Sequence, residues 1–228
     1  MDFILQGLLQ AFKLLFAGDA ETYSAVAATL KVSSYSMAAS LLFGIPLGFV
    51  VGHLQFPGRR AIRLVVDTLL SLPTVFIGLI VYAFLSRQGP LGHMGLLFTL
   101  PGIAIGQAIL ALPVVIALSA AAVESTDANL RPTLLSLGAN RRQLLLGSLW
   151  EARHGILIAA LTAYGRVMTE VGVSMMVGGN IKWHTRTITT AIALETNKGM
   201  FAMGIALGLI LLLIAFSVTA AVSLLRRR

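Results

Sequence analysis

Two ionisable residues lie one helical turn apart inside an apolar stretch that is long enough to cross a membrane. Arg166 and Glu170 are four positions apart between about Gly155 and Val177, so they would share one face of a continuous helix. Ionisable side chains at membrane depth are costly and usually face a bundle interior or a wet cavity as pairs. We expect an ion pair that either holds two helices in register or lines or locks a path through the membrane. If the path carries an anion, Arg166 should neutralise Glu170, because a bare carboxylate would repel the anion.

A second group of chemistry-bearing residues is basic and lies in a polar segment. Lys182, His184 and Arg186 alternate with other residues between two apolar stretches. The cluster is either a solvated loop or a surface that meets an acidic partner protein or attracts an anion through its field.

Enzymatic chemistry has no support in the sequence. The four histidines are far apart and lack metal-ligand spacing, and the chain has no cysteine. We find no Ser-His-Asp set, no paired carboxylates and no GxxxxGK[ST] phosphate loop. We therefore expect no metal site, no enzyme activity and no cofactor in this chain, and an ATPase that drives it would be a separate chain.

A polar, arginine-bearing segment, Leu130–Glu151, interrupts the apolar chain. Thr126–Leu137 has helical periodicity, Gly138 can supply a turn, and Asn140 is a good N-cap for a second short helix over Arg141–Trp150. The segment is either an ordinary interfacial loop or the place where an outside energy source grips the protein.

The composition indicates that the residues above are held by helices that cross a membrane. The chain has 228 residues, of which 57% are hydrophobic and 11% are charged, whereas soluble domains carry about 25% charged residues. We predict one all-α integral membrane domain over residues 1–228, with a polar loop at about 124–153. The net charge of +8 fits loop arginines that set the orientation in the membrane better than nucleic-acid binding.

Five membrane spans follow an amphipathic segment, Phe3–Phe16, that is too short to cross. This segment is expected to lie in the membrane interface or to be partly inserted. The spans are expected at about Tyr23–Gly52, Ile62–Leu85, Leu96–Val123, Gly155–Val177 and Met200–Leu225. The segment Gly178–Lys198 is mixed, and its apolar part, Ile188–Leu194, is too short to cross.

Prolines interrupt the expected spans. Pro73, Pro101 and Pro113 should each kink a helix, and the freed backbone groups could let it bend as a gate opens. Thr74 could offer its hydroxyl to a path or bond back to its own helix.

The orientation follows from the loop charges. With the Arg59 loop, the polar segment and the C-terminus on one side, that side carries ten Lys and Arg, against five on the other. The positive-inside rule then places the N-terminus outside and the C-terminus in the cytoplasm.

The polar segment resembles the coupling loop of ABC importer permeases. Leu137–Arg142 reads LGANRR, and Gly138 and Ala139 fall on the glycine of that signature and the alanine that commonly follows. Pro132, Thr133 and Leu134 stand where the signature has Glu-Ala-Ala, and Trp150 and Glu151 stand where it has Leu-Pro.

Other stretches are similar to molybdate- and tungstate-type permeases. Leu72–Gly78 resembles the Pro-Thr-Val-x-x-Gly stretch of their second span, and Gly165–Ile181 resembles their fourth span and the turn after it. Thr185–Gly199 and Trp150–Arg153 look most like the tungstate branch.

The resemblance implies a permease subunit that imports an oxyanion, with tungstate first and molybdate second, by alternating access in the plasma (inner) membrane of a prokaryote. It implies a second copy around a two-fold axis, two ATPase subunits that hold ATP and Mg, and a periplasmic or lipid-anchored substrate-binding protein. The lipid bilayer surrounds the assembly, and no nucleic acid is expected. A different class, a secondary transporter that uses Glu170 as its proton or cation carrier, stays open, as does a scaffold that transports nothing.

The resemblance also implies roles for residues. Pro73, Thr74, Arg166 and Glu170 would form the path or its gate, and Lys182, His184 and Arg186 would dock the binding protein. Arg141 and Arg142 would be charged contacts to the ATPase, with Leu144 and Leu145 as apolar anchors. The ATPase-coupling set is Leu137, Gly138, Ala139, Asn140, Arg141, Arg142, Leu144 and Leu145.

Overall fold

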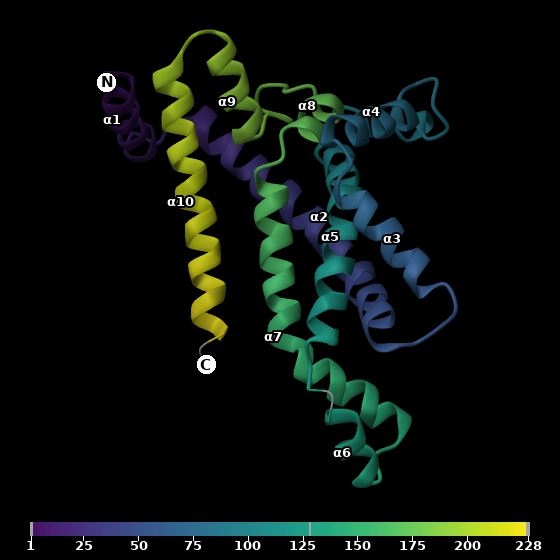
Figure 1. The fold of residues 1–228 in the computed structure, drawn as a ribbon. Helices are drawn as coiled ribbons and strands as arrows, with labels where there is room; N and C mark the ends of the chain where they lie inside the picture. Colours follow the sequence, from purple (N-terminus) through teal and green to yellow (C-terminus); the bar gives the residue numbers. More distant parts are fainter. Residues whose placement is uncertain (1, 128, 227–228) are drawn as a thin grey trace.

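Every element in the part of the chain that the structure describes is helical (Figure 1). The structure is a computed structural model that describes residues 2–127 and 129–226. The elements are α1 (Asp2–Phe16), α2 (Ala20–His53), α3 (Arg59–Leu70), α4 (Thr74–Leu85), the 3₁₀ turn η1 (Gly92–Met94), α5 (Leu100–Glu124), α6 (Leu130–Ser136), α7 (Arg141–Met168), α8 (Gly172–Gly178), α9 (Ile188–Asn197) and α10 (Phe201–Arg226). Among the described residues, four helices are long and apolar enough to cross a membrane, and the bent pair α3–α4 would be a fifth span. The predicted all-α membrane fold is confirmed.

The core of the bundle is the crossing of α2 and α5. Gly44, Gly48 and Gly52 recur at four-residue spacing on α2, and small residues at such spacing let helix backbones approach closely. A Cβ atom at Gly48 would lie 2.7 Å from the carbonyl oxygen of Ile116, so the close contact requires glycine there. Ser40 Oγ also donates a hydrogen bond of 3.1 Å to the carbonyl oxygen of Ala108 on α5.

The expected second span is broken rather than kinked. It consists of α3 and α4, which meet at an angle of 97° across Ser71–Pro73. Proline has no N–H and disfavours helical geometry in the residue before it, which is Leu72, so α3 ends before that residue. Pro73 then becomes the N-cap of α4.

The other two prolines disturb their helix less than expected. Thr99 caps the N-terminus of α5, and Pro101 lies in its first turn, where no intrahelical N–H bond is lost. Pro113 lies inside α5, which continues through it. The expectation that Pro101 breaks a span is therefore wrong.

The expected fourth span and the short helix before it are one element. α7 runs without interruption from Arg141 to Met168, so Arg141–Trp150 is the beginning of the span and not a separate helix. The span also ends earlier than expected, and Gly172–Gly178 forms the separate helix α8.

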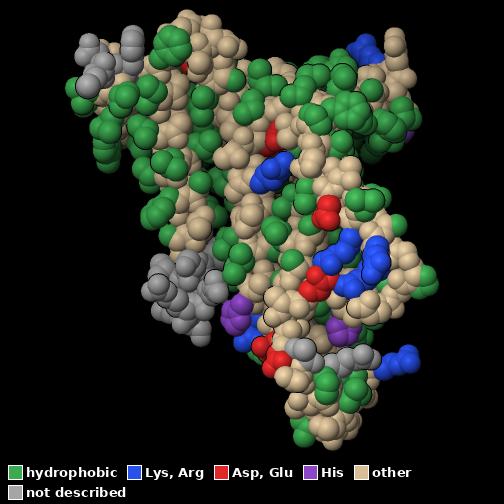
Figure 2. All heavy atoms as spheres, viewed as in Figure 1, with side chains coloured by type: hydrophobic (Ala, Val, Ile, Leu, Met, Phe, Trp, Pro, Cys, Tyr) green, Lys and Arg blue, Asp and Glu red, His purple; other side chains and the backbone are tan. Residues whose placement is uncertain are grey.

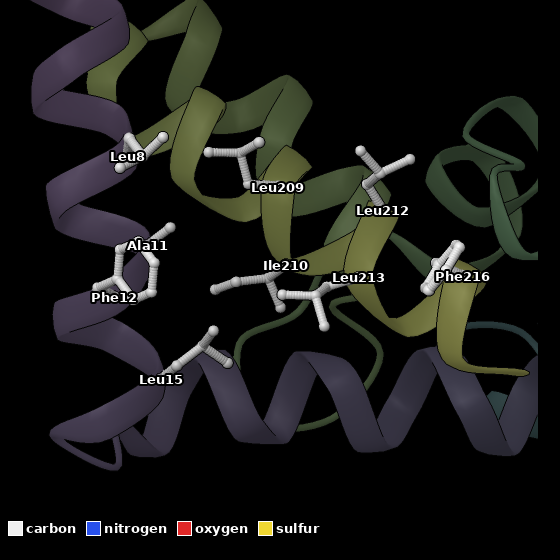
Figure 3. A pocket seen from close by; sticks show the side chains of 9 residues that line it. All are labelled: Leu8, Ala11, Phe12, Leu15, Leu209, Ile210, Leu212, Leu213 and Phe216. Carbon is white, nitrogen blue, oxygen red and sulfur yellow. The ribbon is translucent and has the colours of Figure 1, made fainter. Parts of the chain in front are cut away.

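The first helix packs along α10 (Figure 1). An apolar cavity of about 390 Å³ lies between the two helices, with Leu8 and Phe12 from α1 facing Leu213 and Phe216 from α10 (Figure 3). α1 also exposes Leu5, Leu9 and Phe16, which fits contact with lipid. Large apolar side chains on both sides of a short helix favour a membrane-associated position.

The two ends of the molecule differ in what they carry. α6 projects beyond the other helices at one end, and α4, α8 and α9 gather at the opposite end (Figure 1). Arg227 and Arg228, which count toward the expected orientation, lie outside the described residues.

Candidate functional site

The turn between α6 and α7 is built by local capping. Asn140 Oδ1 accepts a hydrogen bond of 2.9 Å from the N–H of Gln143, and Gln143 Oε1 accepts one of 2.8 Å from the N–H of Asn140. This reciprocal capping box fixes the start of α7. Gly138 precedes it with a φ of 82°, a left-handed conformation that residues with a Cβ rarely adopt. The predicted roles of Gly138 as a turn residue and Asn140 as an N-cap are confirmed.

This turn presents an exposed surface with apolar and basic side chains. Leu137 is 78% exposed, Leu145 is 43% exposed, and Arg141 and Arg142 are also exposed. Leu144 is only partly exposed. Ala139 is half-buried within the turn.

Two leucines without a predicted role complete this surface. Leu134 packs on α7, because a Cβ at Gly147 would lie 3.0 Å from its Cδ1 atom. Leu135 is 52% exposed beside it. The helical period of Thr126–Leu137 would have found both. Leu134 therefore holds α6 against α7, and Leu135 adds to the exposed apolar area.

An ion-pair cluster lies beside the ends of α2, α3 and α5. Glu124 at the end of α5 pairs with both Arg59 and Arg63 of α3. Arg59 also donates a hydrogen bond of 2.7 Å to the carbonyl oxygen of Val51. The cluster therefore ties the ends of three helices together, in addition to any effect of these arginines on membrane orientation.

The broken span brings Pro73 and Thr74 against α8. A Cβ at Gly172, the first residue of α8, would lie 2.8 Å from Thr74 Oγ1 and 3.0 Å from the backbone nitrogen of Val75. Glycine at position 172 thus allows the start of α8 to touch the start of α4. The bend also leaves the first N–H groups of α4 without intrahelical acceptors.

Arg166 and Glu170 are not brought together. α7 ends at Met168, so the helical spacing that would align the two residues is interrupted between them. Arg166 is exposed and forms no ion pair with any described residue. The expected Arg166–Glu170 ion pair is therefore absent from this structure.

Glu170 instead belongs to a buried polar network. It is 7% exposed, and its Oε1 atom accepts a hydrogen bond of 3.2 Å from the N–H of Val173. Its carbonyl oxygen accepts hydrogen bonds from Ser174 Oγ at 3.2 Å and from Thr189 Oγ1 at 3.0 Å. Gln107 on α5 extends this network, because its Nε2 atom donates to Ser174 Oγ at 3.1 Å. The network fastens α8 to α5 and α9.

The basic cluster is partly used within the chain. Lys182 and Arg186 both pair with Glu21 at the start of α2, whereas His184 is exposed. Trp183 lies between them with a φ of 68° and is 54% exposed. Sequence reasoning missed Glu21, because it lies more than 160 positions from the cluster.

Comparisons with known proteins agree with this architecture. Residues 44–228 match the family described as "Binding-protein-dependent transport system inner membrane component". The chain is 49% identical over 216 residues to the "Tungstate uptake system permease protein TupB" of Campylobacter jejuni, covering 95% of this chain and 90% of that one. It is 37% identical to the protein of the same name from Peptoclostridium acidaminophilum, covering 97% of each chain. It is 29% identical to the "Molybdenum transport system permease protein ModB" of Escherichia coli, covering 85% of this chain and 91% of that one.

A solved structure shares the fold. A chain of a bacterial ABC transporter involved in the import of the acidic polysaccharide alginate superimposes with a TM-score of 0.72 at 21% sequence identity, covering 96% of this chain and 83% of that one. At this identity the likeness concerns the fold alone. The family match covers most of the chain, and the helices have the length and apolarity of membrane spans. The chain therefore belongs to the family of multi-pass inner membrane components of binding-protein-dependent transport systems.

Proposed function

We propose that this chain is the membrane-spanning subunit of an ABC importer for tungstate, with molybdate as the second substrate. Two relatives that are 49% and 37% identical over almost the whole chain carry names that specify tungstate uptake. The observation that carries the proposal of a separate driving ATPase is the exposed turn between α6 and α7. The turn lies at one end of the molecule (Figure 1), and its exposed leucines and arginines can be reached there by a soluble partner.

The energy source in this proposal is a pair of ATPase subunits, one for each of two permease copies. ATP and Mg bind to those subunits and not to this chain. Leu137, Leu144 and Leu145 anchor the contact, and Arg141 and Arg142 supply its charged rim. Because α7 begins at this contact, a movement of the contact moves the whole span. This movement opens the path to one side of the membrane and then to the other.

The path in this proposal runs beside Arg166 and the start of α4. A guanidinium group binds oxyanions through charge-assisted hydrogen bonds, and the exposed Arg166 has no described acid paired with it in the protomer. Pro73 and Thr74 form the bend that moves with the gate. Glu170 is buried in hydrogen bonds and acts as a fastening residue of α8 rather than a ligand.

The outer surface in this proposal docks a substrate-binding protein. The end that carries α8, α9 and the N-terminus faces outward, and the C-terminus lies in the cytoplasm. Lys182 and Arg186 hold the loop between α8 and α9 against Glu21. His184 and Trp183 are therefore the side chains of this loop that reach the substrate-binding protein.

The test is uptake by proteoliposomes that contain the permease, its ATPase and its binding protein. We expect ATP-dependent tungstate uptake, with weaker competition by molybdate and little by sulfate. Uptake driven by an ion gradient without the ATPase, and abolished by Glu170→Gln, would instead identify a secondary transporter. Preference for another anion in calorimetry of the binding protein would overturn the substrate but not the transport class.

A further inference from the structure

Two side chains of opposite charge lack a partner in the spans of the protomer. Asp67 on α3 and Arg166 on α7 are both exposed. Neither side chain forms an ion pair or a hydrogen bond with the described residues. Arg63, one turn before Asp67, is by contrast paired with Glu124. Ionisable side chains at membrane depth normally pair, so both residues require a partner from outside the protomer.

The helices that carry the two charges flank the same face. α5 contacts both α3 and α7 and lies between them (Figure 1). Figure 2 shows this side of the molecule, with Lys, Arg, Asp and Glu side chains gathered over α3, α7 and the adjoining end of α5. The upper flank over α1 and α10 is mainly apolar in the same view. The face formed by α3, α5 and α7 is therefore polar, and a polar face within a membrane must be covered by a second protein or border a water-filled path.

The depths of the two charges can be compared along α5. Asp67 borders a cavity of about 250 Å³ together with Ala117 and Ala120 of α5. Ala163, three residues before Arg166, packs with Val114 and Val115 of α5. At 1.5 Å per residue, the two α-carbons differ by about 9 to 13 Å along α5. Side chains lean toward the N-terminus of their helix, so the long Arg166 side chain points toward the level of Asp67.

Lys31 on α2 is a further cation without an ion pair among the described residues. Its depth in the membrane excludes it as the partner of Asp67. The adjacent Val32 packs with Ile103 and Ala104, near the opposite end of α5. Lys31 therefore lies about 20 Å from the level of Asp67 along α5.

We propose that a second copy of this chain covers this face and that Asp67 of each protomer pairs with the partner's Arg166. In a two-fold interface each contact occurs twice, so one symmetric arrangement neutralises all four charges. The inference rests on the proposed function, in which two permease copies enclose the path. The pair closes the path at this depth in the absence of substrate. When the protomers move apart, Arg166 becomes free to face the oxyanion.

Directed cross-linking tests the contact, because the chain has no cysteine. Asp67→Cys with one tag and Arg166→Cys with another tag are co-expressed with the ATPase subunits and treated with a short bifunctional thiol reagent. A disulfide would be too short for side chains that replace an Asp–Arg pair. We expect a linked product that carries both tags, and no such product when Lys31→Cys replaces Arg166→Cys.

The outcomes separate this inference from the proposed function. If the two tags copurify but no product links positions 67 and 166, the pair is wrong and the dimer stands. If the tags do not copurify for the unsubstituted chain either, the proposed dimer is wrong and the pair falls with it.

Charge exchange gives an independent measurement. Asp67→Arg and Arg166→Asp should each lower the melting temperature of the dimer in detergent by about 4 °C or more, since each leaves like charges facing each other. The double variant restores the pair and should recover the melting temperature to within about 2 °C of the original chain, because opposite charges again face each other. Uptake is not the readout for this variant, because it has a carboxylate where Arg166 faces the oxyanion. A double variant that is dimeric by size-exclusion chromatography but melts as early as the single variants overturns the inference.

Discussion

At the residue scale, Gly138 is the position most sensitive to the addition of a side chain in the turn between α6 and α7. Its φ of 82° is unfavourable for a β-branched residue, and such a conformation costs about 1 to 3 kcal/mol. We expect Gly138→Val to displace α6 and to lower the stimulation of ATPase activity by loaded binding protein by about tenfold, which is about 1.4 kcal/mol of coupling. The measurement is ATP hydrolysis in proteoliposomes.

The matched control for this variant is Gly208→Val on α10. A Cβ atom at Gly208 would have no neighbouring atom within 4 Å, and the backbone there has no left-handed φ. The control should keep the stimulation. Equal losses in the two variants would contradict the special role of Gly138.

The capping residues of the α6–α7 turn were predictable because capping is local. Asn140 and Gln143 are three positions apart, and the side-chain oxygen of each accepts a hydrogen bond from the backbone N–H of the other. The absence of the Arg166–Glu170 pair could not be predicted, since the spacing of the two residues aligns their side chains only in a helix that continues beyond Met168. The partners of Lys182 and Arg186 depend on the fold, because it brings Glu21 to them across most of the chain.

At the element scale, the crossing of α2 and α5 should fail when Gly48 gains a side chain. A Cβ there would lie 2.7 Å from both the Ile116 carbonyl oxygen and Ser119 Cβ. The Ile116 oxygen belongs to the backbone of α5, so the whole helix would have to shift to make room. Overpacking costs about 1 to 3 kcal/mol, so Gly48→Leu should lower the melting temperature in detergent by about 4 °C or more. Gly208→Leu is the control, and it should shift the melting temperature by less than half as much.

The hydrogen bond that fastens α8 to α5 gives a second prediction for an element. Gln107→Met keeps a similar length but removes the donor to Ser174 Oγ. A net loss of about 1 kcal/mol should speed the hydrogen exchange of residues 172–178 by about fivefold. The exposed Gln88→Met serves as the control. Unchanged exchange in α8 would show that glycine-mediated packing, and not this hydrogen bond, holds the helix.

The existence of most elements could be predicted from long apolar stretches, but their relations could not. Pro73 marked a disturbance, yet the 97° bend depends on α8 packing against the start of α4. Glu170 and Gly172 interrupt the apolar run after Met168, but no proline marks a helix end there, so the sequence did not separate α8 from α7. Packing decides both points, and packing brings together residues that are distant in sequence.

At the scale of the whole molecule, the orientation that we propose from loop charge can be measured. In the cysteine-free chain, Thr133→Cys on α6 should react with a membrane-impermeant thiol reagent only after the membrane is opened. His184→Cys should react from outside in intact cells. His184 is exposed and Thr133 is at the molecular surface of α6, so accessibility within the fold does not limit either reaction. The reverse labelling pattern would invert the topology and place the α6–α7 turn out of reach of a cytoplasmic ATPase.

The unbroken course of α7 has a mechanical consequence. Its 28 residues form a rod about 42 Å long, with the proposed ATPase contact at one end and Arg166 near the other. A tilt of such a rod by about 5° would displace its far end by about 4 Å. In the proposed mechanism, no hinge is then needed between the ATPase contact and the translocation path. The rod ends at Met168, and the short turn Thr169–Val171 connects it to α8.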